Sequence, residues 1–203
     1  MCLTAPAASA SESSTLSRQP VPEQPTPAAA TAPQIVVMGV SGCGKSSVGA
    51  GLAQALGVEF VEGDLLHPPH NVALMAAGIP LGDEDRAGWL ASIGQRLGRA
   101  QAAGQGLVVS CSALKRRYRD GLRAACPGLR FVYLHGPAAL LRQRMAARSG
   151  HYMPASLLDS QLATLEPPAA DEQALILDIG PGSAEVVAAA LAELQSQSTA
   201  APP

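Results

Sequence analysis

The sequence is most constrained where an apolar segment, a glycine-rich loop and an amphipathic helix follow one another directly. Residues 35–38 are all apolar, which favours a short buried strand. Residues 39–46 read GVSGCGKS and fit the pattern G-x-x-x-x-G-K-[ST] at every defined position. In the helix that follows, apolar side chains recur at every fourth residue from Val48 to Leu56, and Gly57 is a typical helix end. This order of elements predicts a phosphate-binding loop (P-loop) for a nucleoside triphosphate.

The P-loop gives each kind of residue in it a physical task. Glycines let the backbone turn so that successive N–H groups point inward toward an anion, and the helix N-terminus adds partial positive charge. Lys45 is expected to reach the β- and γ-phosphates of ATP, and the Ser46 hydroxyl is the expected ligand for Mg²⁺. The candidate nucleotide-binding residues are Gly39, Val40, Ser41, Gly42, Cys43, Gly44, Lys45, Ser46 and Ser47.

Strand-like and helix-like segments alternate along the rest of the chain. This alternation predicts an α/β domain with a parallel, five-stranded sheet flanked by helices. The strands are expected at residues 35–38, 58–61, 107–109, 131–134 and 175–177. Further helices are expected at residues 71–77 and 83–103 and from about Lys115, Pro137 and Ser183 onward; the one at 83–103 would bury Trp89, Ile93 and Leu97.

One domain, residues 34–195, is predicted between two tails. The chain has 203 residues, which is too short for two ordinary domains. Residues 1–33 are mostly Ala, Pro, Ser and Thr and cannot bury enough apolar surface to offset the entropy of ordering them. A disordered tail is therefore expected there, and residues 196–203 have the same character.

The composition argues against several classes of protein. A net charge of −2 is unlike that of a general nucleic-acid binder. No apolar run is long enough to cross a bilayer, and the first residues lack the basic and apolar regions of a secretory signal. The four cysteines have neither CxxC spacing nor a histidine at zinc-ligand spacing. We therefore expect reduced thiols in a cytoplasmic protein that binds neither membrane nor nucleic acid.

Asp64 marks an abrupt polar break after the second predicted strand. Ligands of open α/β sheets collect at the carboxyl ends of the strands, so Asp64 is expected to face the P-loop. There it would be a candidate for the catalytic base or for a carboxylate in the metal shell. A turn residue whose carboxylate is satisfied by local backbone N–H groups is the alternative, and both interpretations stay open at this stage.

Lys115 and Arg119 lie four residues apart at the start of the helix after the third strand. They are expected to share one helix face near the same edge of the sheet. Lys115 is also one of only two lysines in the chain, the other being Lys45. Two cations there would suit an anionic acceptor such as a sugar acid. A solvated basic face is the alternative, because other arginines lie close by.

Arg144 and Arg148 share a face of the helix after the fourth strand. In small kinases such a segment is typically a mobile lid whose arginines close over the phosphates and exclude water. Both are therefore candidate catalytic residues, whereas Arg142 is expected on the surface. Without the P-loop, a merely solvated helix would be the better interpretation.

A series of motifs covers residues 34–193, the whole predicted domain. The P-loop is followed by GD-x-x-HP-x-x-N at 63–71, which continues through Met75, Gly78, Pro80 and Leu81. The remaining motifs are D-x-DR-x-x-WL at 83–90, CSALK-x-x-YRD at 111–120, R-x-x-x-R-x-GHY at 144–152 and Q-x-x-x-LE at 161–166. Together they resemble the bacterial-type gluconokinase family, and the series is far more specific than the P-loop alone.

The resemblance implies a three-layer α/β/α, adenylate-kinase-like P-loop fold with a helical lid. It also implies Mg²⁺-dependent transfer of the ATP γ-phosphoryl group to the 6-hydroxyl of D-gluconate, commonly by a homodimer. The implied substrate contacts are Asp64, His67, Lys115, Arg119, His151 and Gln161. Two departures are Cys43, where Ser is expected, and Tyr152, where Phe is more usual. Because a helix N-terminus lowers a thiol pKa, Cys43 would make the loop sensitive to oxidation.

Two other functions compete with this one. A shikimate kinase should have three glycines after the third strand, where this chain has Ser112-Ala113-Leu114. A P-loop regulatory module would bind nucleotide without a small substrate. The dense polar residues after the second and third strands argue against it, because a switch protein needs no acceptor pocket.

Overall fold

The structure is a computed structural model that describes residue 1, residues 32–147 and residues 155–199. Residues Thr31–Pro203 form one compact unit. Within the described ranges, no helix has both the length and the apolar character needed to span a membrane.

Five parallel strands form one sheet in the order β2-β3-β1-β4-β5. The strands are β1 Gln34–Met38, β2 Glu59–Glu62, β3 Leu107–Ser110, β4 Arg130–His135 and β5 Leu175–Asp178. The chain moves to one side of β1 for β2 and β3 and then crosses to the other side for β4 and β5. The loop after β1 therefore lies at the point where the strand order reverses, which is where open α/β sheets bind ligands.

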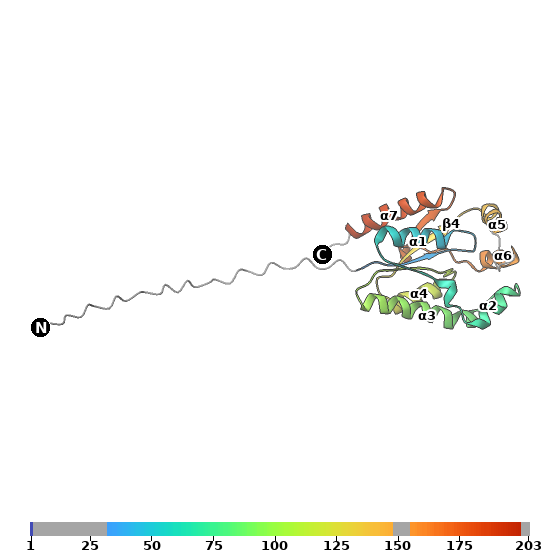
Figure 1. Ribbon diagram of the computed structural model, residues 1–203. Coiled ribbons are helices and arrows are strands. Elements are labelled where there is room, and N and C mark those ends of the chain that lie inside the picture. The colour runs from blue at the N-terminus through green and yellow to red at the C-terminus, as the bar shows by residue number, and fades with distance from the viewer. Residues whose placement is uncertain (2–31, 148–154, 200–203) are drawn as a thin grey trace. The chain divides into compact units, whose positions relative to one another are not determined.

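Helices cover both faces of the sheet (Figure 1), with α1 and α7 on one face and α3 and α4 on the other. The helices are α1 Lys45–Leu56, α2 Pro69–Ala76, α3 Asp83–Ala102, α4 Arg116–Ala125, α5 Ala138–Ala146, α6 Ala155–Thr164 and α7 Ser183–Thr199. Two short 3-10 helices are η1 Gly63–Leu66 and η2 Ala170–Glu172. The predicted three-layer α/β/α architecture is therefore confirmed.

Strand β1 is buried on both faces because each of its alternating side chains meets a helix layer. Ile35 and Val37 pack in the core on the α1 and α7 side. Val36 and Met38 pack in the other core, which Trp89, Ile93 and Leu97 of α3 join as predicted. The P-loop is thus anchored to the most deeply buried part of the sheet.

All five predicted strands are present, and the differences lie at the ends of elements. Strand β2 runs Glu59–Glu62 rather than over 58–61. It is an edge strand, where charged side chains can reach solvent, so its apolar pattern is weaker. Helix α6 was not predicted as a separate element, although its Leu157 and Leu158 are buried in the finished fold.

Candidate active site

The P-loop forms a tight turn that leads into the N-terminus of α1. Gly39 has φ +140°, and a Cβ there would lie 2.5 Å from the Leu134 carbonyl oxygen, so only glycine fits this position. Gly44 caps α1 in the left-handed conformation. Lys45 folds back so that its Nζ donates to the Val40 carbonyl oxygen at 3.2 Å. This is the geometry of a preformed anion nest whose lysine arches over the loop.

Ser46 and Ser47 lie exposed in the first turn of α1. The described residues contain no group of three or more His, Cys, Asp or Glu side chains that could hold a metal ion. Mg²⁺ usually takes one or two protein oxygens plus substrate phosphates rather than a cage of side chains. The Ser46 hydroxyl is available for that purpose at the expected position.

The thiol of Cys43 is covered. The residue is 1% exposed, and its Sγ lies where a side chain on Gly39 would have to go. Burial leaves an oxidant little access, so the structure does not support the expected redox sensitivity. Cys111 and Cys126 are buried free thiols as well, in agreement with the prediction of reduced cysteines.

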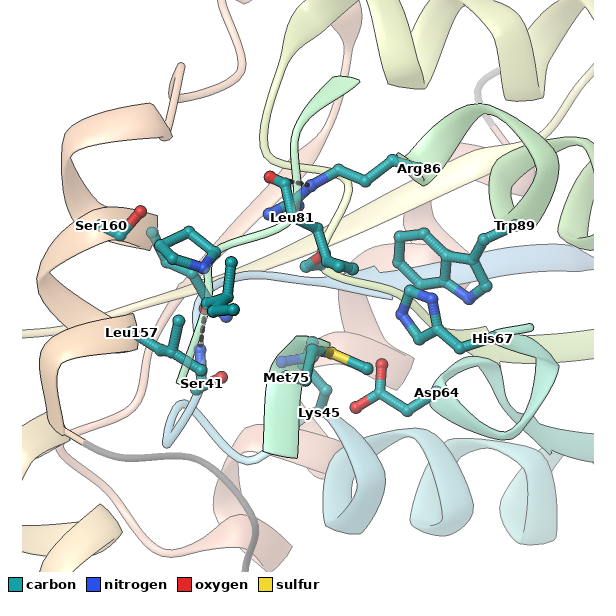
Figure 2. Close-up of a pocket in the computed structure, with 14 residues that line it drawn as sticks. Ser41, Lys45, Asp64, His67, Met75, Leu81, Arg86, Trp89, Leu157 and Ser160 are labelled. Carbon is teal, nitrogen blue, oxygen red and sulfur yellow. Dashed lines mark hydrogen bonds between the residues drawn. The ribbon is translucent and has the colours of Figure 1, made fainter. Parts of the chain in front are cut away.

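A pocket lies on one side of the P-loop, between the loop, η1, α3 and α6 (Figure 2). Asp64, His67 and Trp89 form one wall of it, and Ser41, Leu157 and Ser160 lie opposite. The free space amounts to about 30 Å³, room for little more than a water molecule. The residues that line it are Ser41, Lys45, Asp64, His67, Met75, Ile79, Pro80, Leu81, Arg86, Trp89, Ser112, Leu157, Ser160 and Gln161.

Asp64 is presented to this pocket by a tightly held turn. A Cβ on the preceding Gly63 would lie 2.0 Å from the Ser110 carbonyl oxygen, so the turn presses directly against β3. The Gly63 N–H donates to Ser110 Oγ at 3.1 Å, and the Gly63 carbonyl accepts from Trp89 Nε1 at 2.7 Å. Asp64 itself stays exposed. The turn thus directs the carboxylate into the pocket that also contains Lys45.

His67 lies beside Asp64 in the same wall. Its ring stacks on Trp89, with centroids 4.0 Å apart and planes 16° from parallel. Burial lowers its pKa below the ordinary value, and the nearby Arg86 lowers it further, whereas the charge of Asp64 acts in the opposite direction. His67 thus lines the same pocket as Asp64 and Lys45.

Arg86 is the basic residue that the sequence analysis missed. It lines the pocket, is 9% exposed, and makes one side-chain hydrogen bond among the described residues, from Nε to the Leu81 carbonyl oxygen at 3.3 Å. A signal was available in the sequence. Arg86 lies in the first turns of α3 behind Asp83, Glu84 and Asp85. The helix dipole favours acidic residues there, so a cation at this position indicates another task.

Gln161 connects α6 to the P-loop. Its Oε1 accepts a hydrogen bond of 2.7 Å from the backbone N–H of Ser41, and its side chain lines the pocket. The contact joins residues 120 positions apart in the chain. Gln161 thus lines the pocket and also holds the backbone of Ser41 in the P-loop.

A second cavity of about 320 Å³ lies on the other side of the P-loop. Arg144 lines it and donates from Nη2 to the Ile179 carbonyl oxygen at 2.7 Å. Arg142 is about half exposed and pairs with Asp159, in agreement with the predicted surface position. Arg148 and His151 lie outside the described residues. The cavity is lined by Gly42, Cys43, Gly44, Ser47, Val48, Arg144, Ala147, Ile179, Pro181, Ser183 and Val186.

The prediction that Lys115 faces the acceptor pocket needs correction. Lys115 is not among the residues that line the pocket, and its Nζ bonds to the Asp83 carboxylate at 2.9 Å. Arg117 and Tyr118 also bond to Asp83, and these contacts keep the pKa of that carboxyl well below its usual range. In this structure Lys115 belongs to a cluster that joins the N-terminal ends of α3 and α4.

The prediction for Arg119 is wrong for a different reason. Its side chain is 0% exposed and forms a bidentate pair with Glu172 at 2.6 and 2.7 Å. Its Nη1 donates to the carbonyl oxygens of Ala113 and Glu166 at 3.1 and 3.0 Å. Because its donors are used inside the protein, Arg119 holds the loop after β3 to the segment before β5 and offers nothing to a ligand.

The fold, the P-loop and a carboxylate pocket beside the loop lysine define a P-loop kinase of small molecules. Residues 35–168 match the AAA domain family. The chain is 54% identical to a gluconokinase of Gluconobacter oxydans (strain 621H) over 138 residues, 68% of this chain and 78% of that protein. The chain belongs to the gluconokinase family.

Solved structures agree with this assignment. A gluconokinase from Sinorhizobium meliloti 1021 superimposes with a TM-score of 0.76 at 52% identity, covering 83% of this chain and 95% of that one. A sugar kinase from Janibacter sp. HTCC2649 gives a TM-score of 0.78 at 45% identity, covering 85% and 99% of the two chains.

Proposed function

We propose that this chain transfers the γ-phosphoryl group of ATP to the 6-hydroxyl of D-gluconate, giving 6-phosphogluconate and ADP. One observation carries the proposal: Asp64, Arg86 and Lys45 line a single pocket at the P-loop. The membership in the gluconokinase family supports the choice of acceptor. The chain would thereby act in carbohydrate metabolism, in the use of gluconate.

Each charged residue of the pocket would have a separate role in the reaction. Lys45 would neutralise charge on the transferred phosphoryl group, and Asp64 would accept the proton of the attacking hydroxyl. Arg86 is suited to the gluconate carboxylate, because a guanidinium can bind a carboxylate through two parallel hydrogen bonds. His67 and Gln161 would contact the polyol chain between these two ends.

The second cavity would accept the nucleoside part of ATP. It lies against Gly42 and Gly44 on the side of the P-loop away from Asp64, and Arg144 lies in its wall. We expect Arg144, together with Arg148, to act on the phosphates. Ser46 would hold Mg²⁺, which when bound would neutralise charge on the β- and γ-phosphates.

Gluconate is larger than the free space of about 30 Å³ between the pocket walls. We therefore infer that the acceptor enters only when the walls separate. The parts of the lining that we expect to move are the segment from Met75 to Leu81 and Leu157 to Gln161 of α6. Closure after binding would exclude water from the transferred phosphoryl group.

A coupled assay of ADP formation with a panel of acceptors tests the proposal. We expect turnover with D-gluconate, little with shikimate and little with ATP alone, and a phosphate on the 6-hydroxyl in the NMR spectrum of the product. Turnover with shikimate instead of gluconate would favour the alternative of a shikimate kinase. Nucleotide binding without turnover on any acceptor would favour a regulatory module, and either result would overturn the gluconokinase assignment.

We also propose a cytoplasmic homodimer. The support for the dimer is membership in the gluconokinase family. The support for the cytoplasm is that Cys111 and Cys126 form no disulfide. Sedimentation equilibrium of the purified chain measures the assembly directly, and a single monomeric species would contradict it.

A further inference from the structure

Asn71 is a buried amide that lies between a backbone carbonyl and the ring of His67. Its side chain is 1% exposed. Its Nδ2 lies 2.7 Å from the Asp85 carbonyl oxygen and 3.3 Å from Nδ1 of His67. A backbone carbonyl oxygen can only accept, so the group facing it must be the NH₂ of Asn71. The orientation of the amide is thereby fixed independently of the histidine.

The same NH₂ group has a second hydrogen, and this one faces Nδ1 of His67. Nδ1 can accept it only while Nδ1 carries no proton, and a neutral imidazole then has its proton on Nε2. We infer that Asn71 holds His67 as the Nε2–H tautomer, which offers this N–H as a hydrogen-bond donor to an oxygen atom of the acceptor substrate.

The ring of His67 is also fixed in its plane. One of its faces stacks on Trp89, and Trp89 is itself held by the hydrogen bond from its Nε1 to the Gly63 carbonyl oxygen. Tilting the imidazole out of this plane would break the stacking, and a half-turn within the plane would put Cδ2 in place of Nδ1 and lose the bond to Asn71. The Nε2–H direction is therefore set before a substrate arrives.

The charges around His67 favour its neutral form. Burial and Arg86 of α3 lower its pKa, whereas the charge of Asp64 of η1 raises it. The Asp85 carboxylate has other partners, since its Oδ2 accepts from the Gly82 N–H at 2.7 Å and its Oδ1 lies 4.0 Å from Nε2 of His70. Protonation of Nδ1 would also turn the Asn71 contact into a clash of two donors.

This inference rests on the proposed function and sharpens it. Asp64 can only accept a hydrogen bond when ionised, and His67 in this tautomer can donate one beside it. A polyhydroxylated acid offers both partners, since one hydroxyl gives its proton to Asp64 while another oxygen accepts from His67. In this arrangement Asn71 is a positioning residue, and His67 binds substrate without giving up its proton.

The tautomer can be measured without substrate or turnover. Long-range ¹H–¹⁵N spectra of the full-length, ¹⁵N-labelled protein at neutral pH report which imidazole nitrogen carries the proton, and loss of one ring in His67→Gln assigns the signals. We expect a protonated Nε2 and a bare Nδ1. A proton on Nδ1, or an imidazolium at neutral pH, would overturn the inference whether or not gluconate is the substrate.

Two substitutions of His67 test the contact with substrate. The amide nitrogen of Gln can take the place of Nε2, whereas that of Asn takes the place of Nδ1. We expect His67→Asn to lower kcat/KM for the acceptor about tenfold and His67→Gln to restore most of the loss, with the KM for ATP unchanged in both. An equal loss in both variants would refute donation from Nε2.

Asn71→Asp tests the role of the amide. A carboxylate beside Nδ1 favours a proton there, so we expect the pKa of His67 to rise and the Nε2–H tautomer to lose population in the same spectra. An unchanged tautomer would show that Asn71 does not select it. If Asn71→Asp does not fold, the spectra of the wild type and the two His67 variants still test whether Nε2 donates to the substrate.

Discussion

The two sides of the active site are built in different ways. On the nucleotide side, the phosphate-binding loop is one continuous stretch, residues 39–47, whose geometry comes mainly from the backbone and from glycines. The acceptor side is assembled from side chains on η1, α3 and α6, with Asp64, Arg86 and Gln161 as examples. The conformation of a contiguous backbone motif is set by its own residues, whereas the positions of side chains from separate elements depend on how those elements pack.

The loss of Lys45 is expected to have the largest effect on activity. Lys45→Ala removes the cation that neutralises the transferred phosphoryl group, so kcat should fall by about 10³-fold. The thermal midpoint should stay near that of the wild type, because within the described part of the chain Lys45 makes one side-chain hydrogen bond, to Val40. Steady-state kinetics beside a thermal melt measure both, and near-normal turnover would refute the assigned role of the loop.

Arg119 and Arg116 test whether the α4 cations are structural. Arg119→Met leaves the buried Glu172 with Arg123 as its cationic partner among the described residues, so the free energy of unfolding should fall by about 3 kcal/mol. Arg116→Met breaks an exposed pair with Asp171 and should lower the free energy of unfolding far less, because water screens an exposed pair. Urea unfolding measures both, and a raised gluconate KM with unchanged stability in Arg119→Met would restore the substrate role.

The same buried pair predicts an acid sensitivity. The Arg119 guanidinium lowers the pKa of Glu172 to about 2. Because the folded pKa lies below the ordinary value of about 4.3, the stabilisation is complete above that pH and is lost as the pH falls toward 2. Glu172→Gln should therefore show a flatter loss of stability than the wild type between about pH 5 and 2. Parallel curves in acid urea titrations would contradict this.

Asp64→Asn keeps the size of the side chain and removes its basicity. We expect kcat to fall by about 10²-fold with a small change in the KM for ATP. The exposed Asp120→Asn is a matched control on α4, away from the pocket lining, and should behave as the wild type. Near-normal turnover of Asp64→Asn would return this residue to the alternative of a structural turn.

The difference between the two sides also explains what could be read from the sequence. The five strands and the P-loop follow from apolar runs and glycines in local order. Lys115 and Arg119 were predicted from their spacing on a helix, but spacing does not reveal that Asp83 and Glu172, more than 30 residues away, take up their charges. Arg86 was missed because its approach to the P-loop depends on how α3 packs against β3.

The measurement that tests this account most directly compares two cations replaced in the same way. Arg86→Met and Lys115→Met each remove one positive charge and keep an unbranched side chain. If the acceptor carboxylate binds in the pocket, Arg86→Met raises the gluconate KM at least about tenfold and leaves the ATP KM unchanged. Lys115→Met then changes the gluconate KM less than about threefold. A large rise for Lys115→Met with none for Arg86→Met would contradict the account and place the acceptor at the α4 face.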